Sequence, residues 1–367
     1  MKIIQIIYSL CSGGAEKFVV DLSNQLATMG HEVTLCMLLD DTTDERLTFN
    51  KQFLNNAVNF HSMKFEPGFS ICKVNKVEKY IRAESPDIVH CHLNVIPYVY
   101  GLSIFNHNIK VFHTLHSVAE KASGIKIQRL INRFFYKYNI IKPICISKLC
   151  LQSYQHFYKL NNAFLIDNGR AMISASSYYQ QVKQEVESYK RTPNSIVFIH
   201  VARYNILKNQ ALLINAFNYL AKERCDFILL IVGNGYDCLK GKELQQLACD
   251  KIFFLGEKNN VNDYLLCSDA FCLTSKYEGL PISLLEALSC GITPICTAVG
   301  GIPDVITDGI NGYLSERENI ESYCNAIKRF LTKPLSRNEL IDYYKANYSM
   351  EVCAQKYEKL YKQKLWK

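Results

Sequence analysis

Two glutamates stand eight residues apart in KYEGLPISLLEALSCGITPICTAVGG, residues 276–301 of the chain. An apolar run at 270–274 predicts a buried strand before them, and leucines at helical spacing place Glu286 in a helix that follows Glu278 and a Gly-Leu-Pro turn. The N-terminus of such a helix offers free backbone N–H groups and a positive dipole end to an anion. The pattern predicts a site for a ligand with phosphates at one end and hydroxyls near carboxylates, as in a nucleotide-sugar. The alternative is an ordinary strand, turn and helix with two solvated glutamates.

Two cations follow another predicted strand, Ser195–Val201, in the segment VARYNILKNQALLINAF. Arg203 and Lys208 stand five residues apart, just before a helix predicted over 210–222. A guanidinium and an ammonium at the end of a strand are suited to clamp a diphosphate, and they also stabilise negative charge on a leaving group. A surface pair that flanks a loop is the alternative, and it is the commoner fate of Arg and Lys.

A glycine pair follows the first predicted strand in the sequence Ser12-Gly-Gly-Ala-Glu16. This loop opens a helix predicted over 15–29, so that the glycine backbone and the helix N-terminus are both available to a phosphate. A tight turn between strand and helix is the alternative. The dinucleotide fingerprint GxGxxG is absent here, and Gly233-Asn-Gly235 also lacks the third glycine, which disfavours a dehydrogenase.

Histidines cluster at the ends of two predicted strands in the first half of the chain. His113 and His116 stand three apart, like half of a metal site, but no third ligand is evident. We expect His113 to be structural. His90 and His92 flank Cys91 at another strand end, where they are candidates to line an acceptor cleft. The acidic run at 40–44 is interpreted as a polar loop rather than a set of metal-binding carboxylates.

Taken together, these motifs resemble the retaining glycosyltransferases of family 4, the "glycosyl transferases group 1", and in particular those that build bacterial surface polysaccharides. The resemblance rests on Glu-Gly-Leu-Pro at 278–281, Cys-Gly-Ile-Thr-Pro at 290–294 and Gly-Gly-Ile-Pro-Asp at 300–304, with further matches along almost the whole chain. It implies the GT-B fold, an α/β architecture in which two Rossmann-like, doubly wound domains face a central cleft.

The resemblance also implies a role for each matching residue. Glu278, His116, Arg203 and Lys208 would act at the transferred sugar and the diphosphate as the catalytic set. The donor-binding residues would be Gly14, Arg203, Lys208, Glu278, Gly279, Leu280, Pro281, Ile282, Ser283 and Glu286, with Glu286 on the ribose hydroxyls. This chain has Lys-Asn at 208–209, where many relatives have Lys-Gly. That difference changes the loop and keeps the charge.

Strands and helices alternate twice along the chain, which predicts two parallel sheets covered by helices. We assign residues 1–170 to an N-terminal, acceptor-side domain and residues 195–349 to a C-terminal domain that binds the nucleotide-sugar. The polar stretch 171–194 is interpreted as a linker with some helix. By resemblance, the final helix at 350–367 would pack back on the N-terminal domain.

The composition is that of an ordinary α/β protein of 367 residues, 49% hydrophobic and 21% charged. The 15 cysteines show no CxxC pair or zinc spacing, which predicts reduced thiols in a cytoplasm. No apolar run reaches the length of a membrane-spanning helix, and MKIIQIIYSL is interpreted as a buried strand rather than a signal peptide.

The net charge of +8 is unevenly placed, because residues 121–159 hold eight Lys or Arg and no Asp or Glu. Phe134, Phe135, Tyr136 and Tyr138 lie in the same segment. Basic and aromatic residues on helices suit an anionic membrane surface. A solvated helix face with its aromatics turned into the core is the alternative. No recognition motif for nucleic acid accompanies the charge.

The expected function is that of a metal-independent enzyme without a cofactor, which moves a sugar from a nucleotide-sugar, a UDP-sugar above all, onto a growing saccharide. The acceptor would be carried on a polyprenyl diphosphate, and the protein would lie in the cytoplasm at the inner face of the plasma membrane. Two alternatives stay open. One is a nucleotide-sugar epimerase on the same architecture, and the other is a non-catalytic partner that binds nucleotide-sugars.

Overall fold

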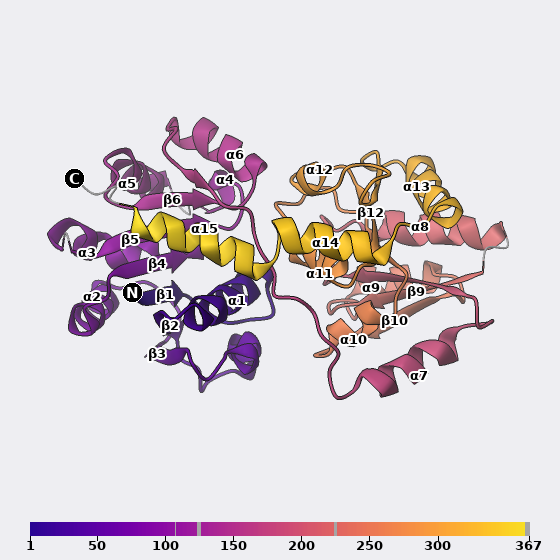
Figure 1. The fold of residues 1–367 in the computed structure, drawn as a ribbon, viewed down its shortest axis with the longest axis horizontal. Helices are drawn as coiled ribbons and strands as arrows, with labels where there is room; N and C mark the ends of the chain where they lie inside the picture. The colour runs from indigo at the N-terminus through magenta and orange to yellow at the C-terminus, as the bar shows by residue number, and fades with distance from the viewer. Residues whose placement is uncertain (107, 123–125, 224–225, 364–367) are drawn as a thin grey trace. The chain divides into compact units, whose positions relative to one another are not determined.

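A computed structural model describes residues 1–106, 108–122, 126–223 and 226–363. The chain divides into two compact units (Figure 1). The first unit combines Met1–Ala171 with Met350–Lys367, and the second unit is Met172–Ser349. Each unit is built around one parallel sheet, so the predicted fold class of two doubly wound α/β units is confirmed.

The sheet of the first unit has the order β3-β2-β1-β4-β5-β6-β7 among the described residues, and all of its pairs are parallel. The strand order therefore reverses between β1 and β4. The strands are β1 (Lys2–Ile7), β2 (Glu32–Leu39), β3 (Asn59–Phe65), β4 (Ile88–His92), β5 (Lys110–Leu115), β6 (Lys142–Cys145) and β7 (Phe164–Leu165).

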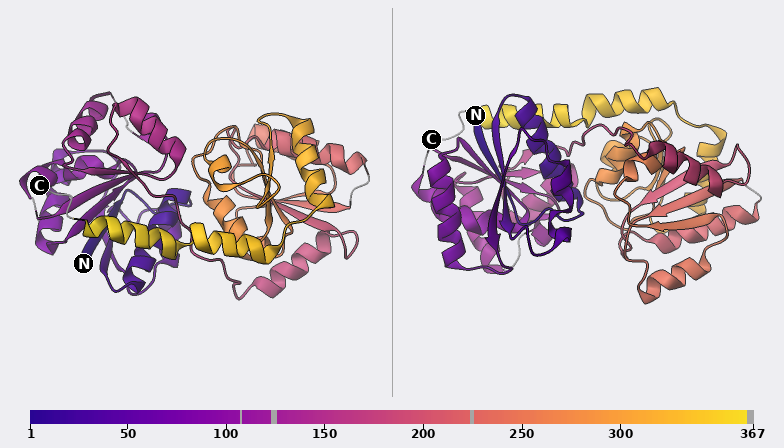
Figure 2. Two further views of the ribbon diagram at one scale, coloured as in Figure 1. Left: turned by 45° about the horizontal axis from the view of Figure 1, so that its top comes forward. Right: turned by 90° about the horizontal axis from the view of Figure 1, so that it is seen from below.

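Helices cover both faces of this sheet (Figure 2). They include the last helix of the chain, which contributes Tyr357 and Tyr361 to the same buried cluster as Phe18 and Phe112. The helices of the first unit are α1 (Gly14–Thr28), η1 (Glu45–Phe53), α2 (Ile71–Glu84), η2 (Leu93–Val99), α3 (Tyr100–Phe105), α4 (Ala119–Ala122), α5 (Lys126–Lys137), α6 (Lys148–Tyr158) and α15 (Met350–Lys362).

The sheet of the second unit has the order β10-β9-β8-β11-β12-β13 among the described residues, again with parallel pairs throughout. Here the order reverses between β8 and β11. The strands are β8 (Ile196–Val201), β9 (Phe227–Val232), β10 (Ile252–Gly256), β11 (Ala270–Leu273), β12 (Thr293–Thr297) and β13 (Tyr313–Ser315).

Helices follow the strands of the second unit and pack apolar side chains against both faces of the sheet in two clusters. They are α7 (Tyr179–Tyr189), α8 (Gln210–Lys222), α9 (Leu239–Leu247), α10 (Val261–Leu266), α11 (Ile282–Ser289), α12 (Ile302–Val305), α13 (Ile320–Thr332) and α14 (Arg337–Asn347). Among the residues that the structure describes, no helix is long and apolar enough to cross a membrane.

The first βα unit shows why these residues form these elements. The run KIIQII has almost no exposed side chain, as expected of a strand covered on both faces. In α1, Phe18, Leu22 and Leu26 recur at helical spacing and are buried. Gly30 then adopts a left-handed φ of 86°, which a side chain would disfavour, and so ends the helix.

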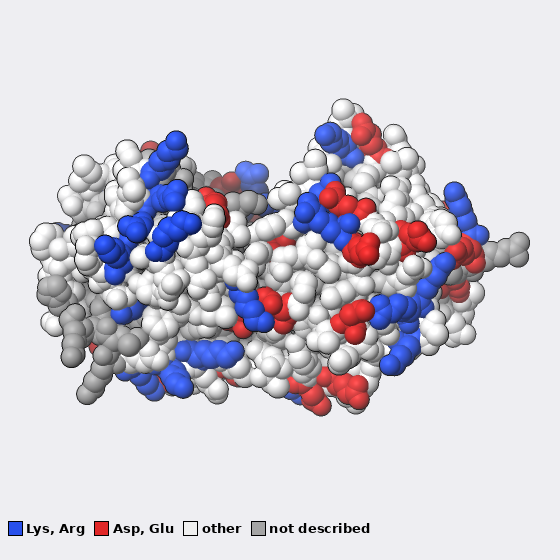
Figure 3. All heavy atoms as spheres, turned by 90° about the horizontal axis from the view of Figure 1, so that it is seen from above, with Lys and Arg blue, Asp and Glu red and all other residues white. Residues whose placement is uncertain are grey.

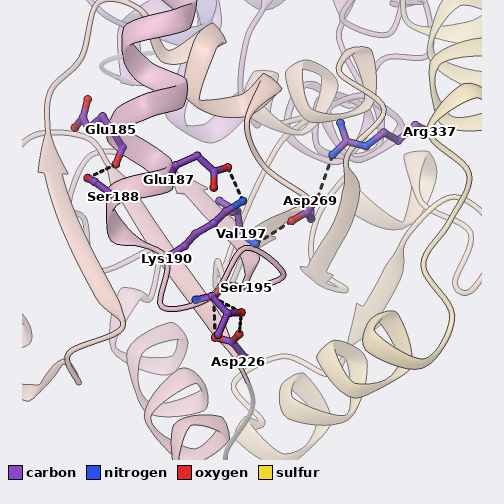
Figure 4. Close-up of polar contacts among 10 residues, drawn as sticks. Glu185, Glu187, Ser188, Lys190, Ser195, Val197, Asp226, Asp269 and Arg337 are labelled. Atoms are coloured by element: carbon purple, nitrogen blue, oxygen red, sulfur yellow. Dashed lines mark hydrogen bonds and ion pairs between the residues drawn. The ribbon is translucent and has the colours of Figure 1, made fainter.

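Polar side chains secure the N-terminal edge of the second sheet (Figure 4). Asp269 accepts a hydrogen bond from the Val197 backbone N–H at 2.9 Å and pairs with Arg337 at 3.3 Å. Asp226 accepts from Ser195 Oγ at 2.8 Å. Both carboxylates are thus engaged by structural partners at this edge of the sheet. The C-terminal edge carries the loops described below.

The strands predicted at 195–201 and 270–274 lie within one residue of β8 and β11. The short strands β7 and β13 and the half-polar edge strand β3 were not predicted, because two or three residues, or a mixed pattern such as NFHSMKF, carry little periodic signal. The interpretation of 171–194 as a linker differs from the structure, which places residues from 172 onward in the second unit. Val182 and Val186 of α7 are buried in its core.

Candidate active site

The switch point of the second sheet brings a cation and a carboxylate together from two separate loops. β8 and β11 are hydrogen-bonded neighbours at the place where the strand order reverses. Arg203 and Lys208 lie in the loop after β8, and Glu278 lies in the loop after β11. In open parallel sheets, the crevice beyond the carboxyl ends of the strands at such a point is the usual ligand site.

Lys208 and Glu278 form a direct ion pair, with Nζ 2.6 Å from Oε1. The same carboxylate oxygen accepts a hydrogen bond from Ser275 Oγ at 2.5 Å. Glu278 is only 8% exposed, so its carboxylate has lost most of its water, whereas the Lys208 side chain is still 26% exposed. Sequence reasoning assigned both charged residues to the site and missed Ser275, which carries no motif of its own.

Backbone contacts hold the two loops against each other. The Lys276 N–H donates to Leu207 O at 2.8 Å, and Thr274 Oγ1 lies 3.2 Å from Lys208 O. Asn209, at the residue where many relatives have glycine, has a left-handed φ of 52°. Asn is among the few residues with a side chain that tolerate this conformation, so the Lys-Asn sequence keeps the turn that Lys-Gly would make.

Arg203 lies on the exposed side of the same loop. Its guanidinium forms no ion pair with any residue that the structure describes, whereas its backbone carbonyl accepts from Gln210 Nε2 at 3.1 Å. The backbone of Gly233 packs so tightly on Ala202 that an added Cβ would overlap the Ala202 carbonyl oxygen. The position of Arg203 is therefore fixed through its backbone, while the charged end remains available to a ligand.

Helix α11 supplies backbone donors next to Glu278. Pro281 is its N-cap residue and makes no side-chain cap, so the first N–H groups, those of Ile282 and Ser283, have no acceptor within the helix. Glu286 lies one turn further along and is partly exposed. The residues predicted to bind the nucleotide-sugar, Gly279–Ser283, thus form one continuous turn between strand and helix, as the sequence predicts.

Gly300 packs against the backbone of Glu278, a role that was not predicted. It has a left-handed φ of 60°, and a Cβ placed on it would overlap the carbonyl oxygen of Glu278. The next N–H, that of Gly301, donates to Gly279 O at 2.9 Å. The glycine pair at 300–301 therefore supports the backbone of the Glu278 turn. It belongs to the Gly-Gly-Ile-Pro-Asp motif, which was the available signal.

Gly14 and His116 belong to the first unit. Gly14 is the first residue of α1, directly after the N-cap Gly13. His116 follows the end of β5, where its Nε2 lies 3.0 Å from Nδ1 of His92 at the end of β4. Phe18 of α1 packs edge-on against the His116 ring, at 5.5 Å between ring centroids.

The other histidines of this unit are buried and hydrogen-bonded. The His113 ring is hydrogen-bonded through both nitrogens, to Tyr136 Oη at 2.6 Å and to Leu93 O at 2.7 Å. These contacts agree with the structural role expected for it. The interpretation of His90 and His92 as residues that line a cleft is wrong, because both have no exposed surface. A predicted strand end indicates where these residues lie in the sheet, but it does not indicate whether another part of the chain covers them.

The acidic run after β2 makes only local contacts. Asp44 caps η1 and pairs with Arg46, and Asp41 pairs with Lys51 at 3.0 Å. Within the described ranges, no group of three His, Cys, Asp or Glu residues is placed to hold a metal ion. The described cysteines are free thiols.

Replacement of Gly300 by alanine should destabilise the second unit and lower catalytic activity. The new Cβ meets the Glu278 carbonyl and also forces a side chain into a left-handed backbone, which together should cost roughly 3 kcal/mol or more in the free energy of unfolding. Urea unfolding of the whole chain, followed by any available activity assay, measures both effects.

Gly30→Ala is the matched control, since Gly30 has a φ of 86° but no atom within 4 Å of an added Cβ. It should cost only the backbone strain, roughly 1 kcal/mol. Equal losses for the two variants would show that contact with the Glu278 turn is unimportant.

Stability should fall as the pH drops from 7.5 to 5.5. Burial lowers the pKa of His113 and His200 to about 4 and that of His116 to about 3, and it holds the pKa values of His90 and His92 well below the ordinary 6.5. The unfolded chain therefore binds protons from about pH 6.5 downward while the folded chain does not. This contribution is complete above pH 6.5 and decreases by roughly 1.4 kcal/mol per histidine per pH unit below it.

Urea unfolding at the two pH values measures this slope, in a window above the range where ordinary carboxylates titrate. His200→Phe should reduce this slope by roughly 1.4 kcal/mol per pH unit, the contribution of one proton, because it removes one buried neutral imidazole. A free energy of unfolding that is the same at both pH values would contradict the neutral burial of these rings.

Two sequence families match the chain, one on each half. The profile described as "Glycosyltransferase Family 4" matches residues 12–170, and the profile described as "Glycosyl transferases group 1" matches residues 181–347. Together they include every predicted site residue.

Curated relatives are similar over most of their length. N-acetyl-alpha-D-glucosaminyl L-malate synthase of Bacillus anthracis is 27% identical, over 83% of this chain and 81% of its own. The UDP-Gal:alpha-D-GlcNAc-diphosphoundecaprenol alpha-1,3-galactosyltransferase of Escherichia coli is also 27% identical, over 71% of this chain and 68% of its own.

Solved structures show the same fold. A glycosyltransferase from Rickettsia africae superposes with a TM-score of 0.80 at 17% identity, over 98% of this chain and 97% of its own. HepE of Anabaena, solved with UDP and glucose, gives 0.75 at 18% identity, over 98% and 99%. With its two parallel-sheet units, its Glu278 turn and its two matching profiles, this chain belongs to the family 4 glycosyltransferases of the GT-B fold.

Proposed function

We propose that the protein is a retaining glycosyltransferase that moves a sugar from a UDP-sugar onto a lipid-linked saccharide, in the synthesis of a bacterial surface glycan. The observation that carries the proposal is the ion pair of Lys208 with the buried Glu278 at the switch point of the second sheet, with Arg203 in the loop of Lys208 and its guanidinium free of ion pairs to the described residues. We further propose that the reaction needs no metal ion or cofactor, because these cations and the α11 N-terminus offer the positive charge that a diphosphate requires.

Donor binding would exchange the partner of Lys208. Without a ligand, the ammonium is neutralised by Glu278 at 2.6 Å. A diphosphate carries more charge than one carboxylate and would draw Lys208 to itself, together with Arg203. Glu278 would then be released to accept hydrogen bonds from hydroxyls of the transferred sugar, and its charge would stabilise a positive anomeric carbon.

The chemistry that follows depends on charge rather than on a covalent intermediate. As the glycosidic bond breaks, the negative charge that develops on the leaving diphosphate would be stabilised by Arg203, Lys208 and the N–H groups of Ile282 and Ser283. Glu286, one turn into α11, would hold the ribose hydroxyls. Attack by the acceptor hydroxyl from the face that the diphosphate leaves would retain the anomeric configuration, and the proton of that hydroxyl would pass to the departing diphosphate oxygen.

The choice of donor and acceptor follows two relatives. HepE of Anabaena was solved with UDP, and the Escherichia coli relative is named for a UDP-sugar donor and a diphosphoundecaprenol acceptor. Staphylococcus aureus CapH, 26% identical over 78% of each chain, is named for capsular polysaccharide biosynthesis. An epimerase would form product without an acceptor, and a non-catalytic partner would bind nucleotide without turnover, so both alternatives have distinct outcomes in the assay below.

UDP should raise the melting temperature of the protein without added metal, and GDP or ADP should do so much less. A ligand at 100 times its Kd stabilises the folded state by about 2.7 kcal/mol, which for units of this size is a shift of several degrees. Arg203→Ala should remove most of the shift and lower kcat/KM for a UDP-sugar by roughly a hundredfold, since it removes one of the two cations proposed for the diphosphate. Thermal-shift titration and a radiolabel transfer assay measure the two effects.

Arg191→Ala is the matched control, an exposed arginine of the same unit whose partner is Asp250. It should bind UDP as the unchanged protein does. Retention of full activity by Arg203→Ala would exclude the clamp, and a folded protein that binds none of the nucleotides would exclude the proposed function.

We also propose that helix α5 places the protein on an anionic membrane, at the cytoplasmic face where lipid-linked acceptors would be found. Ile127, Leu130 and Phe134 stand at helical spacing with 66%, 68% and 50% of their surface exposed, and Tyr138 continues the same stripe. The opposite side of the helix is anchored in the core by Phe135 and Tyr136. Exposed large apolar side chains in one stripe are typical of a helix that lies in a membrane interface.

Positive charge accompanies the stripe. Lys126 and Lys137 at the two ends of α5 are exposed, and the face of the first unit seen in Figure 3 shows clusters of Lys and Arg atoms with few acidic ones. Two other cations have structural partners, since Arg129 and Arg133 donate to the carbonyls of Phe157 and Tyr158 at the end of α6. Part of the basic segment predicted for membrane binding, residues 123–125, lies outside the described residues.

The double variant Leu130→Ser and Phe134→Ser should bind vesicles of phosphatidylglycerol and phosphatidylcholine at least roughly tenfold more weakly, because two inserted apolar side chains are lost. Co-sedimentation with the vesicles measures the change. Pure phosphatidylcholine should bind the unchanged protein less well, since the lysines then lack anionic lipid.

Ile71→Ser is the matched control, because Ile71 is a 75% exposed apolar residue on α2 of the same unit. It should leave vesicle binding unchanged. If the control weakens binding as much as the double variant does, or the double variant binds normally, α5 is not the membrane surface.

A further inference from the structure

A chain of hydrogen bonds runs from the interior of the first unit to His116. Gln5 of β1 places its Oε1 at 2.7 Å from His92 Nε2, and His92 Nδ1 lies 3.0 Å from His116 Nε2. Gln5 and His92 have no exposed surface, whereas His116 is partly exposed. The chain thus runs from the interior of β1 across the end of β4 to His116 after β5, and it stops at a histidine that is partly exposed.

Counting protons along this chain sets the tautomer of each ring. An amide oxygen only accepts, so His92 Nε2 must carry the hydrogen of the first bond. A neutral His92 then has a lone pair at Nδ1, so His116 must donate from Nε2. This leaves the lone pair of His116 at Nδ1, an atom that has no hydrogen bond to a described residue and is not sealed in the interior.

Both rings are neutral at working pH. Burial lowers the pKa of His116 to about 3 and that of His92 well below 6.5; the nearby imidazole of His113 lowers both pKa values further, and that of His90 lowers the pKa of His92. The remaining polar neighbours are also neutral groups. Tyr361 of α15 bonds His90 Nδ1 at 2.7 Å, and Thr114 lies 3.2 Å from Tyr357 of α15. A neutral imidazole has one N–H donor and one nitrogen acceptor, as the assignment of the tautomers above assumes.

We infer that Gln5 and His92 are positioning residues that hold His116 as its Nε2–H tautomer, so that Nδ1 offers a lone pair to a hydroxyl group of a bound sugar. Neither positioning residue touches the ligand. This inference rests on the proposed function for the identity of the hydroxyl, while the tautomer itself is a property of the protein alone.

The nitrogen chemical shifts of His116 test the tautomer without any substrate. In the full chain labelled with ¹⁵N-histidine, and with His116→Asn to assign its signals, Nε2 should appear protonated and Nδ1 unprotonated across pH 6 to 8. A protonated Nδ1 would overturn the inference, because it would mean that the Gln5 amide is turned round and that His116 is a donor to the ligand. This result does not depend on whether the protein transfers sugar.

Gln5→Leu then tests the positioning role. It keeps the volume and removes the acceptor, so His116 should become a mixture of tautomers and kcat should fall roughly tenfold, the value of one hydrogen bond, while the Kd for UDP stays unchanged. Thr114→Val is the matched control, because it removes the neighbouring bond to His90 at 2.7 Å and leaves the chain to His116 intact. It should keep both the tautomer and kcat.

An unchanged His116 spectrum in Gln5→Leu would overturn the positioning role, as would an equal loss of kcat in Thr114→Val. If the unchanged protein transfers no sugar, the proposed function fails, and the spectra alone decide the tautomer. Melting temperatures of all variants exclude a loss caused by unfolding.

Discussion

Parallel strand pairing is the constraint on which both units depend. All strands of a parallel sheet end at the same edge, and the usual ligand site is the crevice beyond those ends at the point where the strand order reverses. In the second unit, this places the loops after β8 and β11 side by side, and with them Lys208 and Glu278. In the first unit, the reversal lies between β1 and β4, next to β5, and the same geometry brings Gln5, His92 and His116 into one line.

The two sites use opposite electrostatic designs. The second unit keeps an ion pair between the buried Glu278 and the partly exposed Lys208, and loss of Lys208 would leave a buried charge without its partner. A ligand that supplies a new anion for Lys208 and hydroxyls for Glu278 satisfies both charges again, so the pair is suited to exchange. The first unit instead holds neutral imidazoles, amide and phenols, whose hydrogen bonds depend on direction rather than charge.

Much of the fold and most of the charged site residues were predictable from sequence. Long apolar runs and helical spacing identified the central strands and α8, while β7 and β13 are too short to carry a pattern. Lys208 and Glu278 were assigned from motif and strand end, whereas Ser275 and Gly300 act through a bond or a close approach that only coordinates reveal. His90 is buried against Tyr357 and Tyr361 of α15, which is more than 250 residues away along the chain, so no local pattern could indicate its burial.

The place of α15 also has a consequence for synthesis. Tyr357, Leu360 and Tyr361 complete a core whose other members lie mostly before residue 170. A ribosome adds residues from the N-terminus onward, so the first unit stays without part of its interior while the whole second unit emerges and folds. The core of the first unit therefore stays incomplete until the last helix has been synthesised. This makes it the part of the nascent chain that most needs protection from aggregation, although it is the first to be made.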